Sequence, residues 1–171
     1  MTKHLLIAAL IAVLPLYAQA QDSTVVAQPQ VAQHMLFEGL EMKGDIYEFS
    51  DSLRHRGYKL EKRMGNQQYF LFHGMVAGRS CYFQVSYTKK TRTVWRIIAQ
   101  VSHTETVSFV DSVSVRYGEI YDSNERGYQW MQPSGSAMFM TPEQGDPSLI
   151  IVDAEGYLLY REEDVLGQRQ R

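Results

Sequence analysis

Two periods of apolar and polar residues follow each other along the chain. Over residues 45–56 apolar positions recur every three or four residues, which predicts a helix capped by Asp45 and ended at Gly57. The segments after it alternate between apolar and polar residues and are separated by short turns. They predict four strands, at residues 58–64, 68–76, 79–87 and 93–101. The pattern indicates an antiparallel meander packed on one helix.

The helical period returns up to Gly118. Ser102 and Glu105 have the spacing of a capping box, and valines at three-residue spacing follow them. Four more short strands are predicted, at residues 127–132, 136–141, 148–153 and 157–162. The fold class is therefore expected to be α+β, with two tandem units of one helix followed by an antiparallel meander of about four strands. The single domain would cover residues 34–163, with units at 34–101 and 102–163 and a polar tail at 164–171.

The first twenty residues have the layout of a secretory signal peptide. Lys3 and His4 precede an apolar run that ends at Leu16, and Ala18-Gln19-Ala20 has the small-x-small pattern of a cleavage site. The run is shorter than the roughly 20 apolar residues of a membrane span, and Gln21 stands where a lipoprotein has a cysteine. We expect residues 1–20 to be removed and residues 21–33 to form a flexible leader. The product would be a periplasmic or secreted chain, soluble after cleavage following Ala20.

Composition excludes several classes of function. Lys and Arg total 17 against 19 Asp and Glu, so the chain lacks the basic excess of a nucleic-acid-binding domain. Cys81 is the single cysteine, which leaves no intramolecular disulfide and no zinc site built on cysteine pairs. The histidines lack metal-site spacing, and the serines lie in neither a Gly-x-Ser-x-Gly nor a Ser-x-x-Lys motif. We therefore expect no catalytic residues, no metal and no cofactor.

The first meander offers a candidate binding surface. One set of alternating residues is apolar and expected to face the helices: Phe70, Phe72, Val76, Cys81, Phe83, Val85, Trp95, Ile97 and Ala99. This places Cys81 as a buried, inert thiol; the alternative is a nucleophile in contact with His73. The opposite set includes the residues that we propose as a binding site: Tyr69, His73, Tyr82, Gln84 and Arg96. Aromatic and arginine side chains are enriched at binding hot spots, although this face could instead pack against the second unit.

A resemblance to known families lies near the start of the predicted domain. Its motifs are Leu36-Phe37-Glu38-Gly39-Leu40, then Gly44-Asp45-Ile46 with Phe49 and Leu53, and Gly57-Tyr58. These resemble the opening of small signal-bearing envelope or secreted domains of uncharacterised function in Gram-negative bacteria. The doubled helix and meander are similar to the tandem repeats of beta-lactamase-inhibitor-like proteins and to the small outer-membrane assembly lipoprotein module. The resemblance implies a binding or assembly role on an antiparallel sheet.

We therefore expect a non-catalytic protein-binding or envelope-assembly module. Its partner would be a protein. Two alternatives stay open: a hydrolase that acts on envelope or extracellular polymers, and a domain that binds a peptide or another small ligand.

Overall fold

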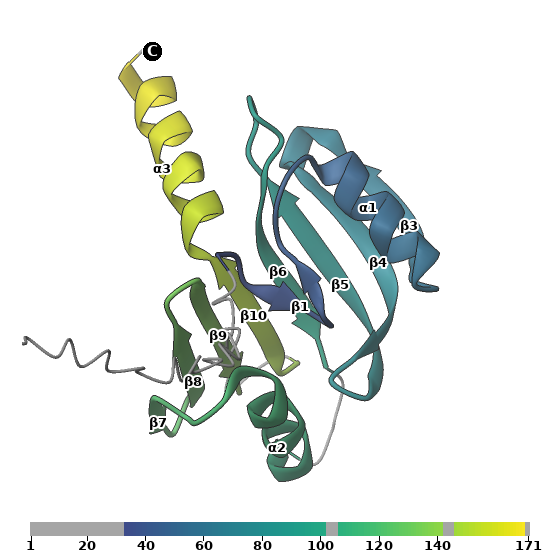
Figure 1. Ribbon diagram of the computed structural model, residues 1–171, viewed down its shortest axis with the longest axis vertical. Helices are drawn as coiled ribbons and strands as arrows, with labels where there is room; N and C mark the ends of the chain where they lie inside the picture. Colours follow the sequence, from purple (N-terminus) through teal and green to yellow (C-terminus); the bar gives the residue numbers. More distant parts are fainter. Residues whose placement is uncertain (1–32, 102–105, 142–145, 170–171) are drawn as a thin grey trace, which may run out of the picture. The chain divides into compact units, whose positions relative to one another are not determined.

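The computed structural model describes residues 33–101, 106–141 and 146–169. Figure 1 shows helices packed on a large antiparallel sheet, so the α+β prediction is confirmed. All described residues belong to one compact unit of the chain, Val31–Arg171. The predicted signal peptide, nearly all of the predicted leader, and the capping pair Ser102 and Glu105 lie outside the described residues.

The first helix, α1 (Ile46–His55), forms where the period predicts it. Asp45 caps it, because its side chain accepts a hydrogen bond of 2.8 Å from the backbone N–H of Tyr47. Gly57 then adopts a φ of +88°, a left-handed conformation that costs glycine little. The turn at Gly57 reverses the chain and sends the next strand back along α1.

Eight strands form one antiparallel sheet, in the spatial order β3-β4-β5-β6-β10-β9-β8-β7. A separate two-stranded hairpin precedes α1, formed by β1 (Leu36–Phe37) and β2 (Leu40–Glu41), and a short 3-10 turn, η1 (Gly65–Gln67), joins β3 to β4. The strands of the large sheet are β3 (Lys59–Met64), β4 (Tyr69–Val76), β5 (Arg79–Tyr87), β6 (Val94–Gln100), β7 (Asp122–Asn124), β8 (Gly127–Gln132), β9 (Gly135–Met140) and β10 (Ser148–Asp153).

The prediction of two helix-plus-four-strand repeats is wrong. β6 and β10 pair over five residue pairs, from Gln100 with Ser148 to Arg96 with Val152, so the two meanders form a single sheet. Each strand carries an isoleucine on both faces, Ile97 and Ile98 on β6 and Ile150 and Ile151 on β10, and β-branched residues favour strands. The backbone groups at the edge of each meander are therefore hydrogen-bonded to the other meander, and neither meander is a separate repeat.

The second half of the chain also differs from the prediction at its end. Residues 157–162, predicted as a strand, lie in a third helix, α3 (Ala154–Arg169), which continues where the pattern predicts a polar tail. The Tyr160 ring stacks on Trp95 at 4.3 Å between centroids, and Glu163 accepts hydrogen bonds from the backbone N–H groups of Lys90 and Thr91. These contacts fix α3 as a helix, because a short apolar run by itself fits either structure.

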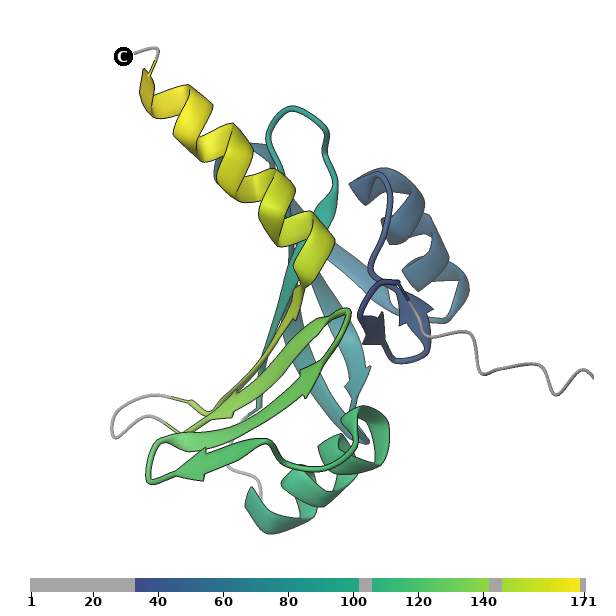
Figure 2. The same cartoon turned by 60° about the vertical axis from the view of Figure 1, so that its left-hand side comes forward.

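The hydrophobic core lies on one face of the sheet. Figure 2 shows the β1–β2 hairpin and α1 over one part of this face and α2 (Thr106–Tyr117) below them. Phe37 packs on Phe83 with centroids 4.9 Å apart, and Phe109 of α2 packs on Phe139 at the same distance. Burial of such side chains contributes about 1.5–3 kcal/mol each. None of the described helices is long and apolar enough to cross a membrane.

Candidate functional site

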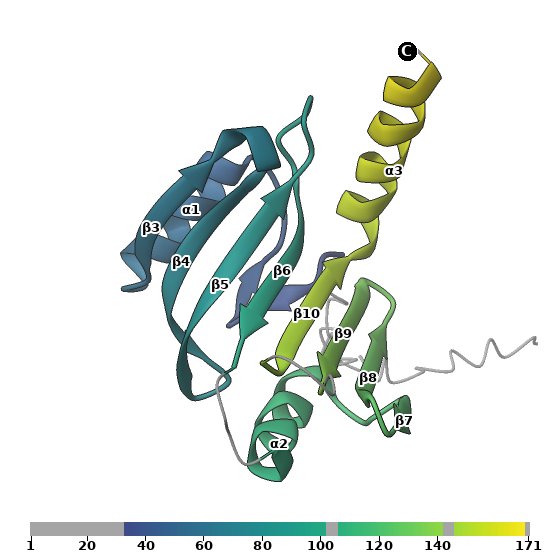
Figure 3. The same ribbon diagram turned by 180° about the vertical axis from the view of Figure 1, so that it is seen from behind.

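The face of the sheet opposite the core carries the five predicted site residues. His73 pairs directly with Tyr82, and Arg96 pairs with Ser86, which itself lies opposite Tyr69. Their sequence neighbours Phe72, Phe83 and Ile97 are buried on the core side. Because side chains alternate along a strand, Tyr69, His73, Tyr82, Gln84 and Arg96 all lie on the outer side. Figure 3 shows this side, with α1 behind the strands.

The strands of the second half of the chain do not cover the outer face. The sheet order places β10, β9 and β8 beside β6, so the second meander widens the face. We call this surface the open sheet face. It extends over five neighbouring strands, β4, β5, β6, β10 and β9. Its residues are Tyr69, Leu71, His73, Met75, Tyr82, Gln84, Arg96, Ile98, Ile150, Val152, Met138 and Met140.

Aromatic and polar contacts organise the first half of the open sheet face. The rings of His73 and Tyr82 lie 4.8 Å apart, and the Nε2 atom of His73 lies 3.2 Å from the hydroxyl of Ser80. Tyr82 is 52% exposed and Met75 is 53% exposed, so the two side chains present large apolar surfaces to solvent. Large exposed apolar side chains on the face of a sheet are candidates for contact with a partner.

Arg96 is the charged group at the centre of this face. Its guanidinium lies 4.5 Å from the Trp95 ring and donates one long hydrogen bond, 3.5 Å, to Ser86 Oγ. Its Nε atom is buried and has no hydrogen-bond partner among the described residues. Burial lowers the pKa of Arg96 from its ordinary value, because the protein removes water from the charged form. The remaining donors of the fork can bind a carboxylate.

Sequence reasoning missed the second half of the open sheet face. Ile150 and Val152 of β10 point outward between the buried residues Leu149, Ile151 and Asp153. Met138 and Met140 do the same on β9. The alternation in these two segments was a usable signal, but only the pairing of β6 with β10 shows that they adjoin Arg96 and Ile98.

Cys81 does not meet His73. It is buried and points to the core side, whereas His73 points to the outer side, so the thiol–imidazole contact that a cysteine nucleophile needs is not formed. Burial and, to a smaller extent, the nearby carboxylate of Glu38 together raise the pKa of the Cys81 thiol to about 11. The thiol therefore stays protonated at neutral pH.

Within residues 33–101, 106–141 and 146–169, no cluster of three or more histidine, cysteine, aspartate or glutamate side chains could hold a metal ion. The chain was also compared with known proteins. No family model, no curated protein and no solved structure matches it.

Proposed function

We propose that this chain is an exported, non-catalytic binding module whose open sheet face holds a protein partner. One observation carries the proposal: the outer face of the sheet presents exposed Tyr82 and Met75 on β5 and β4, carries the charged group of Arg96 further along on β6, and is extended by the second meander. Aromatic, methionine and arginine side chains are the types enriched at the centre of protein interfaces.

The chemistry of the face defines the partner. Leu71, Ile98 and Ile150 form an apolar centre, which favours a partner that presents an apolar surface of its own. Arg96 favours a partner carboxylate at that centre, since its guanidinium has donors to spare. Lys59 and Lys62 stand on the outer side of β3 and extend the positive charge to the rim. We therefore propose an apolar protein surface with acidic groups as the ligand.

The proposed location is the periplasm or the exterior. It depends on the signal-peptide pattern of residues 1–20. Mass spectrometry of the protein recovered from a periplasmic fraction should give a chain that begins at Gln21. An intact chain beginning at Met1 in the cytoplasmic fraction would contradict the proposed export.

Two variants test the open sheet face. Tyr82→Ala and Arg96→Ala remove its aromatic and charged contacts, and Tyr121→Ala removes a tyrosine that is 73% exposed but lies outside the sheet. Each protein is immobilised and incubated with an envelope extract, and bound proteins are quantified by mass spectrometry. A photo-crosslinking residue at position 82 or 121 then reports which surface touches the partner.

The expected result is a partner retained by the parent protein and by Tyr121→Ala but reduced about tenfold by Tyr82→Ala, because truncation of a hot-spot residue costs at least about 1–2 kcal/mol. Crosslinks should form from position 82 and not from position 121. Equal retention by all variants, or crosslinks from position 121 alone, would refute the proposed surface. A crosslink from position 82 to a second copy of the chain would replace the foreign partner with a dimer.

A further inference from the structure

A basic groove lies between α1 and the edge strand β3, away from the open sheet face. The groove has a volume of about 570 Å³ and is lined by Arg54, Gly57, Tyr58, Lys59, Leu60 and Arg63. Five of the 17 lysines and arginines of the chain fall within residues 54–63: Arg54, Arg56, Lys59, Lys62 and Arg63. This concentration contrasts with the formal net charge of −2 for the whole chain. We propose that the groove binds a phosphate monoester.

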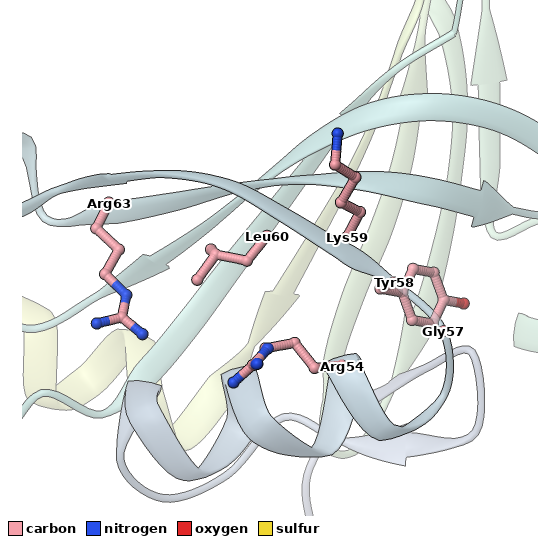
Figure 4. A pocket seen from close by; sticks show the side chains of 6 residues that line it. All are labelled: Arg54, Gly57, Tyr58, Lys59, Leu60 and Arg63. Atoms are coloured by element: carbon pink, nitrogen blue, oxygen red, sulfur yellow. The ribbon is translucent and has the colours of Figure 1, made fainter.

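Two guanidinium groups approach the groove from opposite walls. Figure 4 shows Arg54 lying along α1 on the side that faces β3, while Leu60 and Arg63 point from β3 toward α1. Lys59 points to the other side of the strand, as its pairing with His73 requires. The ligand would thus lie between Arg54 and Arg63, with Leu60 as an apolar wall.

Arg63 is held in place by aromatic rings. Its guanidinium carbon lies 5.6 Å from the centre of the Tyr47 ring and 5.4 Å from that of Phe70. These cation–π contacts use none of the guanidinium N–H groups as hydrogen-bond donors, so the donors stay available to an anion. None of the ion pairs among the described residues involves Arg63. Arg63 is therefore a pre-positioned cation with free donors.

The carbonyl oxygens at the C-terminal end of α1 do not neutralise the positive charge of the groove. The terminal carbonyl oxygens of Leu53 and Arg54 accept hydrogen bonds from the N–H groups of residues 56–58. Arg54 has one carboxylate, Asp51, at 3.1 Å, and this pair is exposed and weak. Arg54 and Arg63 thus face the groove with Asp51 as the one carboxylate of the described residues paired to either of them, which favours an oxyanion as the ligand.

Protection of the sheet edge does not account for this arrangement. Lysines and a bulge on an edge strand discourage pairing with other chains, and β3 has both, with its bulge between Leu60 and Lys62. Edge protection needs neither a facing arginine on α1 nor an arginine placed near two aromatic rings. Two guanidinium forks around one space match the bidentate recognition of phosphate.

The test is a titration of the full chain with phenyl phosphate, followed by amide chemical shifts in NMR spectra at an ionic strength of about 0.15 M, where weak long-range attraction is screened. The parent protein is compared with Arg54→Gln, Arg63→Gln and Arg63→Lys. Lys89→Gln is the matched control, because it removes a cation from the β5–β6 loop. A thermal denaturation curve of each variant checks that it is folded. Vesicles with and without phosphatidic acid form a second arm.

We expect saturable shifts at residues 54–63, and about tenfold weaker binding for each Arg→Gln variant, as for loss of a charge-assisted contact. Arg63→Lys should also bind phenyl phosphate more weakly, because lysine lacks the bidentate guanidinium group. Lys89→Gln should bind it with the same affinity as the parent protein. Binding to phosphatidic acid vesicles but not to phenyl phosphate would assign the phosphate to a lipid headgroup and keep the site. Absence of saturable shifts with both ligands, or equal weakening by Lys89→Gln, would overturn the proposal. The open sheet face is untouched in these variants, so this outcome is independent of partner binding.

Discussion

Asp153 gives the sharpest test of how the fold is held together. It is fully buried at the end of β10, and its two carboxylate oxygens accept three hydrogen bonds. Oδ1 accepts from the backbone N–H of Met35 at 2.8 Å, and Oδ2 accepts from the N–H of Gly156 at 2.9 Å. The Nδ1 atom of His34 lies 3.2 Å from Oδ2. One carboxylate thus joins the start of the described chain to β10 and caps α3.

The cost of removing this carboxylate follows from its contacts. In Asp153→Ala, α3 loses its capping bond, which costs about 1 kcal/mol. The buried N–H of Met35 loses its acceptor, which costs a further 1–3 kcal/mol or so. We expect the free energy of unfolding to fall by about 3 kcal/mol, and Tm to fall by roughly 6–12 °C for a chain of this size. Asp153→Asn keeps one acceptor oxygen for Met35 and should lose only about 1 kcal/mol.

Urea denaturation followed by circular dichroism measures these differences. Asp51→Ala is the control, because its pair with Arg54 is exposed and should contribute less than about 0.5 kcal/mol. The order of stability should be parent, then Asn, then Ala at position 153. If Asp153→Ala lost less than about 1 kcal/mol, or if Asn and Ala lost equal amounts, the two-oxygen account would be refuted.

Three further predictions follow from single contacts. Gly74→Ala should lower the free energy of unfolding by about 2–3 kcal/mol in the same denaturation assay, because the new Cβ would lie 2.3 Å from the Tyr58 ring. Gly65→Ala should change the free energy of unfolding little, because there is open space around Gly65. Cys81 should resist iodoacetamide in the folded protein and react in urea, as mass spectrometry can show. Because its pKa is raised to about 11, its contribution to stability should be complete below the pKa of the unfolded thiol and fall as the pH rises toward 11. For Glu163, burial opposes ionisation, but the N–H groups of Lys90 and Thr91 outweigh it and lower the pKa. Glu163→Gln should therefore destabilise the protein at neutral pH by about 0.5–1 kcal/mol. In urea denaturation, the difference in free energy of unfolding between the two proteins should disappear as the pH falls below the ordinary glutamate range. A difference that stays constant with pH would contradict this account.

The local elements of the first half could be predicted because their signals lie within the segment. The period of Ile46, Phe49 and Leu53, with Asp45 before it and Gly57 after it, identifies α1. The alternation along β4 and β5 likewise separates Phe72 and Phe83 from His73 and Tyr82. Such patterns record which face of an element is buried, and this information needs no knowledge of distant residues.

The assembly of the elements could not be predicted in the same way. The pairing of β6 with β10 joins residues about fifty positions apart, and the alternation within each strand shows which face is buried but does not identify the neighbouring strand. The helix α3 was missed for a similar reason: Tyr157 and Tyr160 fit a strand until Trp95 is placed beside them. Asp153, the last residue of a predicted strand, is buried because groups from distant and local residues converge on its carboxylate.

The edge strand β3 explains how one chain can hold two separate binding surfaces. Its residues alternate so that Lys59 and Lys62 lie beside His73 and Leu71 on the outer side, while Leu60 and Arg63 lie beside Phe72 and Phe70 on the side of α1. The bulge at Glu61 preserves this division, because the extra residue lets Leu60 and Lys62 pair with adjacent residues of β4. Leu60 and Arg63 of the basic groove therefore point away from the open sheet face, whereas Lys59 points to its side. It follows that Tyr82→Ala and Arg63→Gln act on different ligands, and that either proposal can fail without the other.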